Sequence, residues 1–451
     1  MLSAADNDYL TQVGPGTPMG RLLRAYWIPV LYVHELPEPD GPPMRIRLLG
    51  ESLVAFRDSA SRAGLLDHRC PHRQASLFYG RNEEGGLRCL YHGWKFDVEG
   101  RCMDIPNEPG SERLRQKICA RAYPCRERNG IIWTYMGAGS PPPLPEMGWA
   151  KVPIEQKTTL KYLRECNWVQ AMEGDFDSSH LAFLHLAFDP TLQETRHERK
   201  WGTDYYRNRT RMAGTAKLDV VDTPVGVVYG ARRETEEEKE YWRVTQFQLP
   251  FYTSVPAYSG LNRLKIWVPM DDEHTMVWEA NWNMHETLTL EQRRGWKDRV
   301  GPSGFEPETS GWYGRGRFAA NRDNDYLQDR ERQRRVNFTG MENVTPVQDG
   351  AMQESMGPIV DRSREHLIAS DAAIIRMRKC LMKAARALES GQDPPPGVLE
   401  PESYFAHGDQ MLLAPGVDWR TEYRARMEAY YRRWAQDDEE VLSTPGRSVV
   451  D

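Results

Sequence analysis

Two short cysteine–histidine pairs constrain the fold of this chain more than any other feature. The first pair lies in Cys70-Pro71-His72 and the second in Cys89-Leu90-Tyr91-His92, with sixteen residues (73–88) between them. Each pair stands in a turn-like segment, and the chain between them is long enough for one hairpin. We therefore expect two neighbouring loops that bring four metal-binding side chains together.

The order of these side chains distinguishes two kinds of metal site. Zinc sites usually pair like with like, as C-x₂₋₄-C and H-x₃₋₅-H, whereas here each pair combines one Cys with one His. A Rieske [2Fe–2S] cluster has two Cys on one iron and two His on the other, and its neutral ligands raise the reduction potential. The spacing predicts such a cluster on Cys70, His72, Cys89 and His92. A zinc site and unliganded side chains are the alternatives.

Residues 44–136 follow an all-β pattern of short apolar runs separated by turns. This regular spacing predicts a small β-sandwich or barrel with both metal loops at one end. A short helix is expected before it, at Pro18–Tyr26. The stiff segment Ser140-Pro141-Pro142-Pro143-Leu144-Pro145 follows the strands, and we place a domain boundary there.

A second group of metal-binding side chains lies in residues 166–185. Two imidazoles beside carboxylates are typical of the 2-His-1-carboxylate site, which binds iron(II) in oxygenases and leaves positions open for O₂ and substrate. Alternatively, His180 is a core residue and His185 a helix-end cap. Positions 180 and 185 lie about 140° apart on an ideal helix, so a shared metal requires the helix to end, or to form a π-bulge, between them. Asp177 shares a helix face with His180, which favours Asp177 as a hydrogen-bond acceptor for the imidazole.

The third ligand must be a carboxylate from farther along the chain. Strand-like runs dominate 201–282 and predict an antiparallel sheet covered by helices, one of them at Ile374–Leu388. The chain as a whole is thus predicted to be α+β, with an N-terminal all-β domain. From the residues alone the choice of the third ligand stays open among Asp323, Asp325, Asp349 and Glu354.

These motifs resemble those of the Rieske non-haem iron aromatic-ring-hydroxylating oxygenases, α-subunit type. The cluster motif C-P-H-R…C-x-Y-H-G-W-x-F begins at Cys70 and ends at Phe96. The family pattern N-W-x₄-E-x₃-D-x₂-H-x₄-H is matched by Asn167, Trp168, Glu173, Asp177, His180 and His185. Segments at 322–327, 337–340 and 353–363 are similar to the phthalate 4,5-dioxygenase branch, and the resemblance covers most of residues 8–390.

The resemblance implies a domain organisation and a set of roles. It implies a Rieske domain at 1–145, a helix-grip catalytic domain with mononuclear Fe(II) at 146–390 and a C-terminal extension at 391–451. Asp349 matches the family's Q-D-x-x-x-x-E segment and is the implied third iron ligand. In the family, the Asp at position 177 bridges the iron ligand His180 of one subunit and His92 of its neighbour. A homo-oligomer follows from this, as a trimer or two stacked trimers.

The branch acts mostly on aromatic carboxylates, including phthalates and chlorobenzoates, and on some aryl ethers. The implied reaction adds both oxygens of O₂ to the ring to give a cis-dihydrodiol, with a monooxygenase or O-demethylase as the alternative. A carboxylate in an apolar pocket needs an Arg, so Arg207 and Arg243 are candidate substrate contacts, together with Ser178. The alternative places each Arg on the solvent face. No G-x-G-x-x-G or flavin motif is present, so NADH must act through a separate flavin/iron–sulfur reductase.

Composition agrees with a globular enzyme. The 451 residues are 39% hydrophobic and 27% charged, and the net charge of −6 argues against a nucleic-acid partner. No apolar run approaches the roughly 20 residues that span a bilayer, so no membrane contact is expected. The polar N-terminus and the seven scattered Cys favour a cytoplasmic location.

Two further segments carry expectations about packing. The charge run 232–240 is predicted to be a solvated hairpin end. The apolar residues of a helical stripe in the C-terminal extension are expected to pack on their own domain or to form a subunit contact. These residues are Trp419, Tyr423, Met427, Tyr430 and Trp434.

Overall fold

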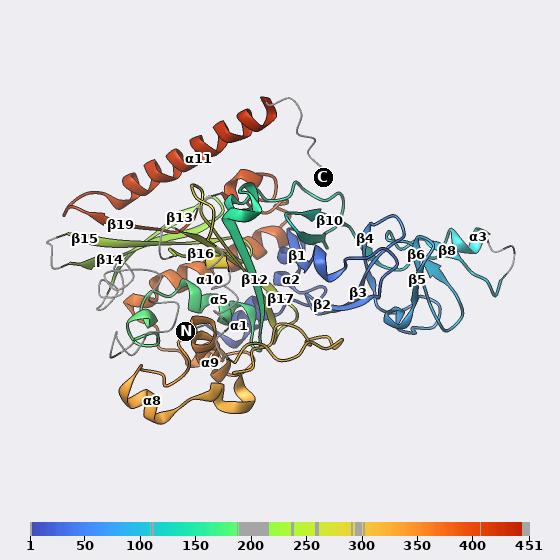
Figure 1. The fold of residues 1–451 in the computed structure, drawn as a ribbon, viewed down its shortest axis with the longest axis horizontal. Coiled ribbons are helices and arrows are strands. Elements are labelled where there is room, and N and C mark those ends of the chain that lie inside the picture. Colours follow the sequence, from blue (N-terminus) through green and yellow to red (C-terminus); the bar gives the residue numbers. More distant parts are fainter. Residues whose placement is uncertain are drawn as a thin grey trace.

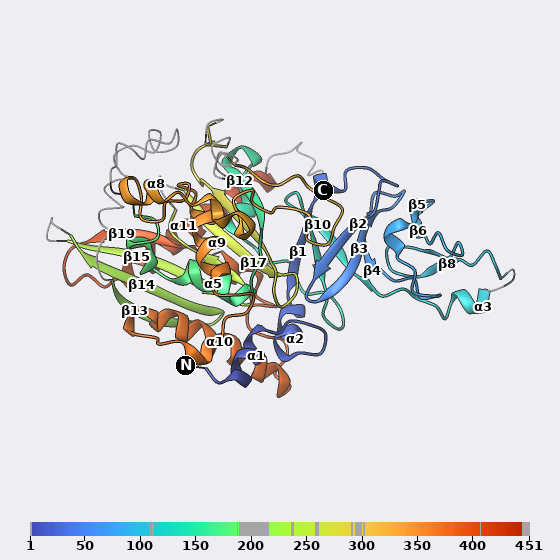
Figure 2. The same cartoon turned by 90° about the horizontal axis from the view of Figure 1, so that it is seen from below.

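Strands organise both parts of this chain, which is seen here in a computed structural model (Figures 1 and 2). The structure describes residues 2–108, 110, 112–186, 188, 216–235, 239–257, 261–289, 292–293, 300, 303–405 and 407–443, with the backbone alone for 433–443. Within these residues, no helix has the length and apolar character needed to cross a membrane.

Three small antiparallel sheets form the N-terminal region. Their strands are β1 (Trp27–Tyr32), β2 (Met44–Leu48), β3 (Glu51–Arg57), β4 (Ala63–Asp67), β5 (Arg81–Glu83), β6 (Gly86–Arg88), β7 (Lys95–Phe96), β8 (Cys102–Asp104), β9 (Ala122–Tyr123), β10 (Cys125–Arg128) and β11 (Ile131–Tyr135). The strand orders are β1-β11-β10, β2-β3-β4-β9 and β5-β6-β7-β8. The last sheet and the short helix α3 (Glu112–Arg115) lie at one end of the elongated molecule (Figure 1).

One large antiparallel sheet forms the C-terminal region. Its strands are β12 (Lys157–Arg164), β13 (Lys217–Thr223), β14 (Gly226–Glu234), β15 (Glu240–Gln248), β16 (Tyr252–Ser254), β17 (Asn262–Pro269), β18 (Thr275–Trp282) and β19 (Asp409–Leu413). They follow the order β12-β18-β17-β16-β15-β14-β13, and β19 pairs with β15. An all-β N-terminal region and a sheet with helices confirm the predicted α+β class.

Helices cover the large sheet on both faces. The helices are α1 (Ala4–Thr11), α2 (Pro18–Arg24), α4 (Gly148–Lys151), α5 (Trp168–Phe176), α8 (Arg330–Arg335), α9 (Thr345–Ser355), α10 (Ala372–Glu389) and α11 (Trp419–Ser443). In Figure 1, α5 and α10 lie below the sheet and α11 crosses above it. The ring of Phe176 in α5 meets Tyr229 edge-on, with ring centroids 4.9 Å apart. On the other face Trp419 stacks on Trp242 at 5.6 Å. Because both faces are covered, every residue of β15 is buried.

The N-terminal helices pack on the C-terminal region, and Arg24 of α2 also pairs with Glu51 of β3 in the small sheets at 2.9 Å. Contacts join α2 and α1 to α10. The amide of Asn7 donates to the carbonyl of Val360 at 3.0 Å and accepts from Arg362 at 3.0 Å. The domain limits at 145 and 390 stay predictions.

The apolar stripe of α11 packs on its own domain. Trp419 and Tyr423 are buried in a cluster with Trp242, and Met427 packs against it. Trp282 donates its indole N–H to the Tyr430 hydroxyl at 2.7 Å. The side chain of Trp434 lies outside the described residues.

The prediction of a solvated hairpin end at 232–240 is wrong at two positions. Arg233 is 4% exposed and Glu240 is 9% exposed. Strand β14 continues to Glu234 and β15 begins at Glu240, so both residues belong to the covered sheet rather than to its connecting turn.

Candidate metal centres

The two cysteine–histidine loops meet at the tip of the N-terminal region. Cys70 follows β4 and Cys89 follows β6, and their side chains are 1% and 3% exposed. The rings of His72 and His92 face each other edge-on, with centroids 4.4 Å apart. Backbone hydrogen bonds shape the loops, because Cys70 N–H donates to Ala75 at 2.8 Å and Gly93 N–H donates to Cys89 at 3.0 Å.

Glycine is required at position 93. Its φ is +76°, and a Cβ there would lie 2.7 Å from Cγ of Pro106. The next residue, Trp94, stacks on the His72 ring at 4.3 Å with an interplanar angle of 8°. Its indole N–H donates to Asn107 at 3.0 Å. The stacking of Trp94 holds the His72 ring in the orientation in which it faces the loop of His92.

The chemistry of the four side chains fits a metal cluster. Burial raises the pKa of the Cys70 thiol to about 12, backbone N–H groups of His72 and Arg73 oppose this rise, and Cys89 adds to it. Nδ1 of His92 is buried and has no hydrogen-bond partner in the described part of the chain. A buried thiol and a buried ring nitrogen without a partner are both unfavourable. A bound metal satisfies both groups, because the thiol loses its proton on coordination and the ring nitrogen donates its lone pair.

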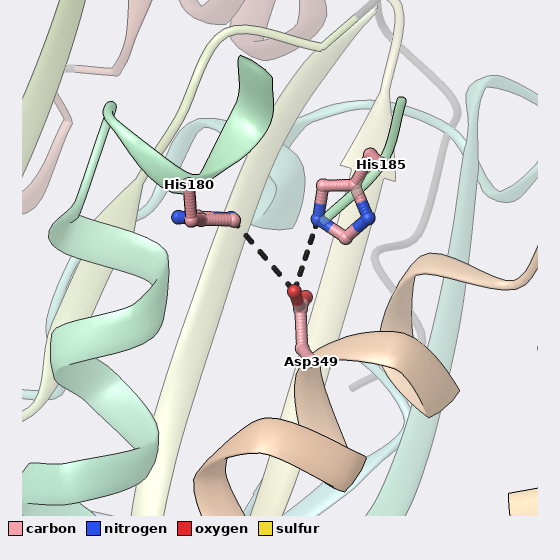
Figure 3. Close-up of side chains that lie close together, drawn as sticks. All are labelled: His180, His185 and Asp349. Atoms are coloured by element: carbon pink, nitrogen blue, oxygen red, sulfur yellow. Dashed lines mark ion pairs between the residues drawn. The ribbon is translucent and has the colours of Figure 1, made fainter. Parts of the chain in front are cut away.

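The second centre joins three side chains from two segments that are distant in the sequence (Figure 3). His180 lies in a 3₁₀ turn (His180–Ala182) after α5, His185 follows that turn, and Asp349 lies in α9. Nε2 of His185 is 3.0 Å and Nε2 of His180 is 3.8 Å from Oδ1 of Asp349. The ligand atoms of all three residues lie within 4.8 Å of one another, and in the described ranges this is the one group of its kind.

Helix α5 ends before both histidines, whereas binding of one metal by both requires only that the helix ends between them. Its last residue is Phe176, and Asp177 is extended (φ −94°, ψ 131°), so both histidines lie on the chain beyond the helix. Asp177 Oδ1 accepts from the N–H of Ser179 at 2.6 Å, which closes the turn that carries His180. The prediction that the helix ends or forms a π-bulge between positions 180 and 185 is therefore wrong in position, because α5 ends before either histidine and only a 3₁₀ turn lies at His180–Ala182.

Two outer hydrogen bonds set the tautomers of the histidines. Nδ1 of His180 lies 3.2 Å from the Asp177 carboxylate, and Nδ1 of His185 lies 2.7 Å from Oε1 of Gln348. Both partners are acceptors, so Nδ1 carries the proton and each Nε2 keeps its lone pair for a metal. Nε2 of His185 is buried and makes no hydrogen bond of good geometry among the described residues.

The electrostatics favour an ionised carboxylate at this centre. Burial opposes ionisation of Asp349, but in the metal-free protein the positive charge that His185 and His180 carry when protonated outweighs it and holds the pKa of Asp349 well below its usual range. Burial likewise disfavours a charged His180, yet the hydrogen bond to Asp177 and the charge of Asp349 raise the pKa of His180. One anion and two aligned imidazoles are the donor set that suits iron(II).

Packing between α5 and α9 brings Asp349 to the histidines. Gln170 of α5 donates to the carbonyl of Gln353 at 2.6 Å, and Gln353 donates to the carbonyl of Ala171 at 3.2 Å. A Cβ at Gly174 would meet Nε2 of Gln353, so the Gln353 amide occupies the space that glycine leaves open. Asn167 caps α5 by accepting from the N–H of Val169 at 3.1 Å.

The other carboxylates considered for the third ligand have different surroundings. Arg317 donates to Asp323 at 2.6 Å, and the Tyr326 hydroxyl donates to Glu354 at 2.6 Å. Asp325 is exposed in a left-handed turn with φ 53°. The structure therefore brings Asp349, and none of these three, to the two imidazoles.

Two of the three predicted substrate contacts, Arg243 and Ser178, lie within the described residues, and both are buried. Arg207 lies outside the described residues. Arg243 is buried in β15 and donates to the carbonyl of Pro256 at 3.3 Å, so it is not on the solvent face. Ser178 is buried directly after Asp177, and its hydroxyl and carbonyl oxygens accept from Arg233. Sequence reasoning missed Arg233 and Gln348.

Replacing Gln348 with Met is expected to weaken iron binding about 10–100-fold, the usual effect of losing such an outer partner. The amide cannot turn freely, because its NH₂ group donates to Thr339 at 3.2 Å and to Glu342 at 3.1 Å. Met keeps the volume but leaves Nδ1–H of His185 without an acceptor. Iron retained during dialysis against a chelator measures the effect, with exposed Gln392→Met as the control. Equal retention in both variants would contradict the role of Gln348.

Comparisons with known proteins identify the family. Residues 26–122 match the model of the Rieske [2Fe-2S] domain, and residues 134–441 match the model described as LigXa C-terminal domain like. The chain is 38% identical over 443 residues to the oxygenase subunit of 3-chlorobenzoate-3,4-dioxygenase from Comamonas testosteroni, covering 96% of this chain and 100% of that relative. This chain belongs to the Rieske oxygenases. Enzymes of this family use a [2Fe–2S] cluster, mononuclear iron and O₂, with electrons from a reductase.

Two more relatives of this Rieske oxygenase bear on its chemistry. It is 36% identical over 470 residues to the phthalate 4,5-dioxygenase oxygenase subunit of Pseudomonas putida, with 100% of both chains covered. It is 30% identical over 415 residues to the 5,5'-dehydrodivanillate O-demethylase oxygenase subunit of a Sphingobium species, covering 89% of this chain and 84% of the relative.

Solved structures support the fold of this Rieske oxygenase. A chain from the reduced complex between oxygenase and ferredoxin in carbazole 1,9a-dioxygenase matches with a TM-score of 0.54. The match has 18% identity and covers 87% of this chain and 98% of that chain.

Proposed function

We propose that this Rieske oxygenase adds both atoms of O₂ to an aromatic carboxylate of the phthalate or chlorobenzoate kind, giving a cis-dihydrodiol. The observation that carries this proposal is the match along nearly the whole chain to two oxygenase subunits named for such substrates, at 38% and 36% identity. The electrons come from NADH through a separate flavin/iron–sulfur reductase.

The proposed ligands follow the geometry of the two centres. Cys70, His72, Cys89 and His92 hold the cluster, and His180, His185 and Asp349 hold the iron. When bound, the cluster supplies single electrons and the iron activates O₂. The chain's own contribution is to orient these groups. Asp177 and Gln348 hold the Nδ1 protons of the two histidines, and the packing of α5 on α9 sets the position of Asp349.

We propose a homo-oligomer, a trimer or two stacked trimers, in which Asp177 of one subunit faces His92 of the next. The small sheet β5–β8, next to the cluster loops, lies at one end of the molecule, away from α5 and α9 (Figure 1). Leu90 and Tyr91, next to His92, are 60% and 56% exposed. Large apolar side chains in such a position favour contact with a second subunit.

The second candidate is a monooxygenase or O-demethylase that uses the same metal ligands. The O-demethylase relative at 30% identity favours it. The two reactions share both metal centres and differ in the ring substituent that the pocket presents to the iron.

Product analysis with ¹⁸O₂ separates the two candidates. The purified protein is reduced without O₂, given phthalate isomers, chlorobenzoates or methoxybenzoates, and then exposed to ¹⁸O₂. We expect a diol that carries two labelled oxygens from a phthalate or chlorobenzoate. Loss of a methyl group with incorporation of one labelled oxygen would establish the O-demethylase. If every substrate fails while the iron content is full, the proposed substrate class is wrong.

A further inference from the structure

Arg233 is a buried cation whose hydrogen bonds are incomplete. It lies in β14 and is 4% exposed. Nη2 donates to the carbonyl oxygen of Ser178 at 3.0 Å and to its hydroxyl at 3.2 Å. Nε and Nη1 are buried and have no hydrogen-bond partner among the described residues. A buried guanidinium without full partners is unfavourable, so the position calls for an acceptor that the described residues do not supply.

The register of the sheet places Arg233 on the face that carries the metal centre. Residues opposite each other on antiparallel strands point to the same face, and the pairs here are Arg233 with Tyr241 and Ala231 with Arg243. Tyr229, two pairs farther along this face, contacts Phe176 at the end of α5. The chain leaves α5 there and continues directly into Asp177 and Ser178.

No carboxylate neutralises Arg233 within the described residues. Burial and the nearby Arg243 lower the pKa of Arg233, while Asp177 opposes this effect. The Asp177 carboxylate is already engaged by Nδ1 of His180 and by two backbone N–H groups of its turn. Arg233 is therefore a buried guanidinium bonded to the residue that follows Asp177, with Arg243 as a second buried guanidinium nearby.

We propose that Arg233 and the Ser178 hydroxyl bind the carboxylate of the substrate, so that Arg233 selects carboxylates over neutral rings. The inference rests on the proposed function and names the residue that sets its substrate class. The Ser178 oxygen accepts from Arg233 and keeps its own proton for a second acceptor, and a carboxylate offers acceptors to both groups. Hydrogen bonds between charged partners are the strong ones, so a carboxylate gains more here than an amide of the same shape.

The test compares Arg233→Met with Arg232→Met. Arg232 is adjacent in β14 but points to the opposite face, where it pairs with Glu240. Binding of 3-chlorobenzoate and of the neutral 3-chlorobenzamide to the metal-loaded protein is measured by calorimetry. We expect Arg233→Met to weaken 3-chlorobenzoate about 10–100-fold, the effect of one lost hydrogen bond to a charged group. The affinity for 3-chlorobenzamide should stay within about 3-fold, and Arg232→Met should change neither.

Unchanged binding of 3-chlorobenzoate by Arg233→Met overturns the inference, and so does equal weakening of benzoate and benzamide, which would show a role in shaping the pocket only. If Arg233→Met fails to fold, Arg233→Lys replaces it, because Lys keeps the charge without the fork of donors. A benzoate-to-benzamide preference unchanged in Arg233→Lys also overturns the inference, and a reduced preference supports it.

The outcome for wild type separates this inference from the proposed function. If wild type binds and oxidises carboxylates while Arg233→Met keeps the same preference, the role of Arg233 is wrong and the proposed function stands. If wild type binds neither 3-chlorobenzoate nor phthalate, both are wrong.

Discussion

An Asp349→Ala variant is expected to lose the mononuclear iron and all detectable oxygenase turnover while it keeps the [2Fe–2S] cluster. Asp349 is the one carboxylate that lies beside both imidazoles in the described part of the chain. Its removal leaves two neutral ligands and takes away the negative charge that favours a divalent cation. Iron should therefore fall from about three to about two atoms per chain.

Iron quantitation together with the visible spectrum of the cluster measures this change. Asp323→Ala is the matched control, because Asp323 is an exposed carboxylate paired with Arg317 and lies apart from the histidines. It should keep all three irons and its turnover. Full iron content in Asp349→Ala would show that another carboxylate completes the site.

Asp177→Asn should load both metal centres and still reduce turnover on the order of 10²-fold. The amide can accept from Nδ1 of His180, so the imidazole keeps its tautomer and its iron. The negative charge is lost, and with it the link that we propose between His180 of one subunit and His92 of the next. The expected defect therefore lies in electron delivery rather than in metal binding.

A single-turnover measurement distinguishes these two steps. Reduced Asp177→Asn is mixed with substrate and O₂, and the rate at which the cluster becomes oxidised is followed directly. Ser179→Ala is the control, because only its backbone N–H contacts Asp177. Wild-type turnover in Asp177→Asn would exclude the bridging role, and loss of iron would show that Asp177 supports the metal site instead.

Sites whose residues are close together in the sequence could be predicted from the sequence alone. The cluster ligands sit two or three residues apart within each pair, so local geometry brings them together whatever the rest of the fold does. The same is true of Asp177 and His180, which lie three positions apart and form the expected hydrogen bond. Helix geometry correctly excluded one straight helix through both histidines, but α5 ends at Phe176, before either histidine, and not between them as predicted.

The third ligand required tertiary structure or a family resemblance. Asp349 is 164 positions from His185 in the sequence, and Asp323, Asp325 and Glu354 are equally plausible candidates from the residues alone. What selects Asp349 is the packing of α9 on α5, through the hydrogen bonds of Gln170 and Gln353. No short sequence pattern predicts a contact between two helices that are so distant in the sequence.

Arg233 is the clearest case in which a prediction from neighbouring residues was wrong. In the sequence it stands in a run of charges, and such a run is normally solvated. Its burial depends on how far β14 extends and on the covering of the sheet by α5 on one face and α11 on the other. Alternation along a strand assigns Arg233 and Arg232 to opposite faces, but only the packed helices decide which of these faces carries the metal centre. The ligand motifs are local and were predicted from the chain, whereas the buried charges beside them depend on long-range packing.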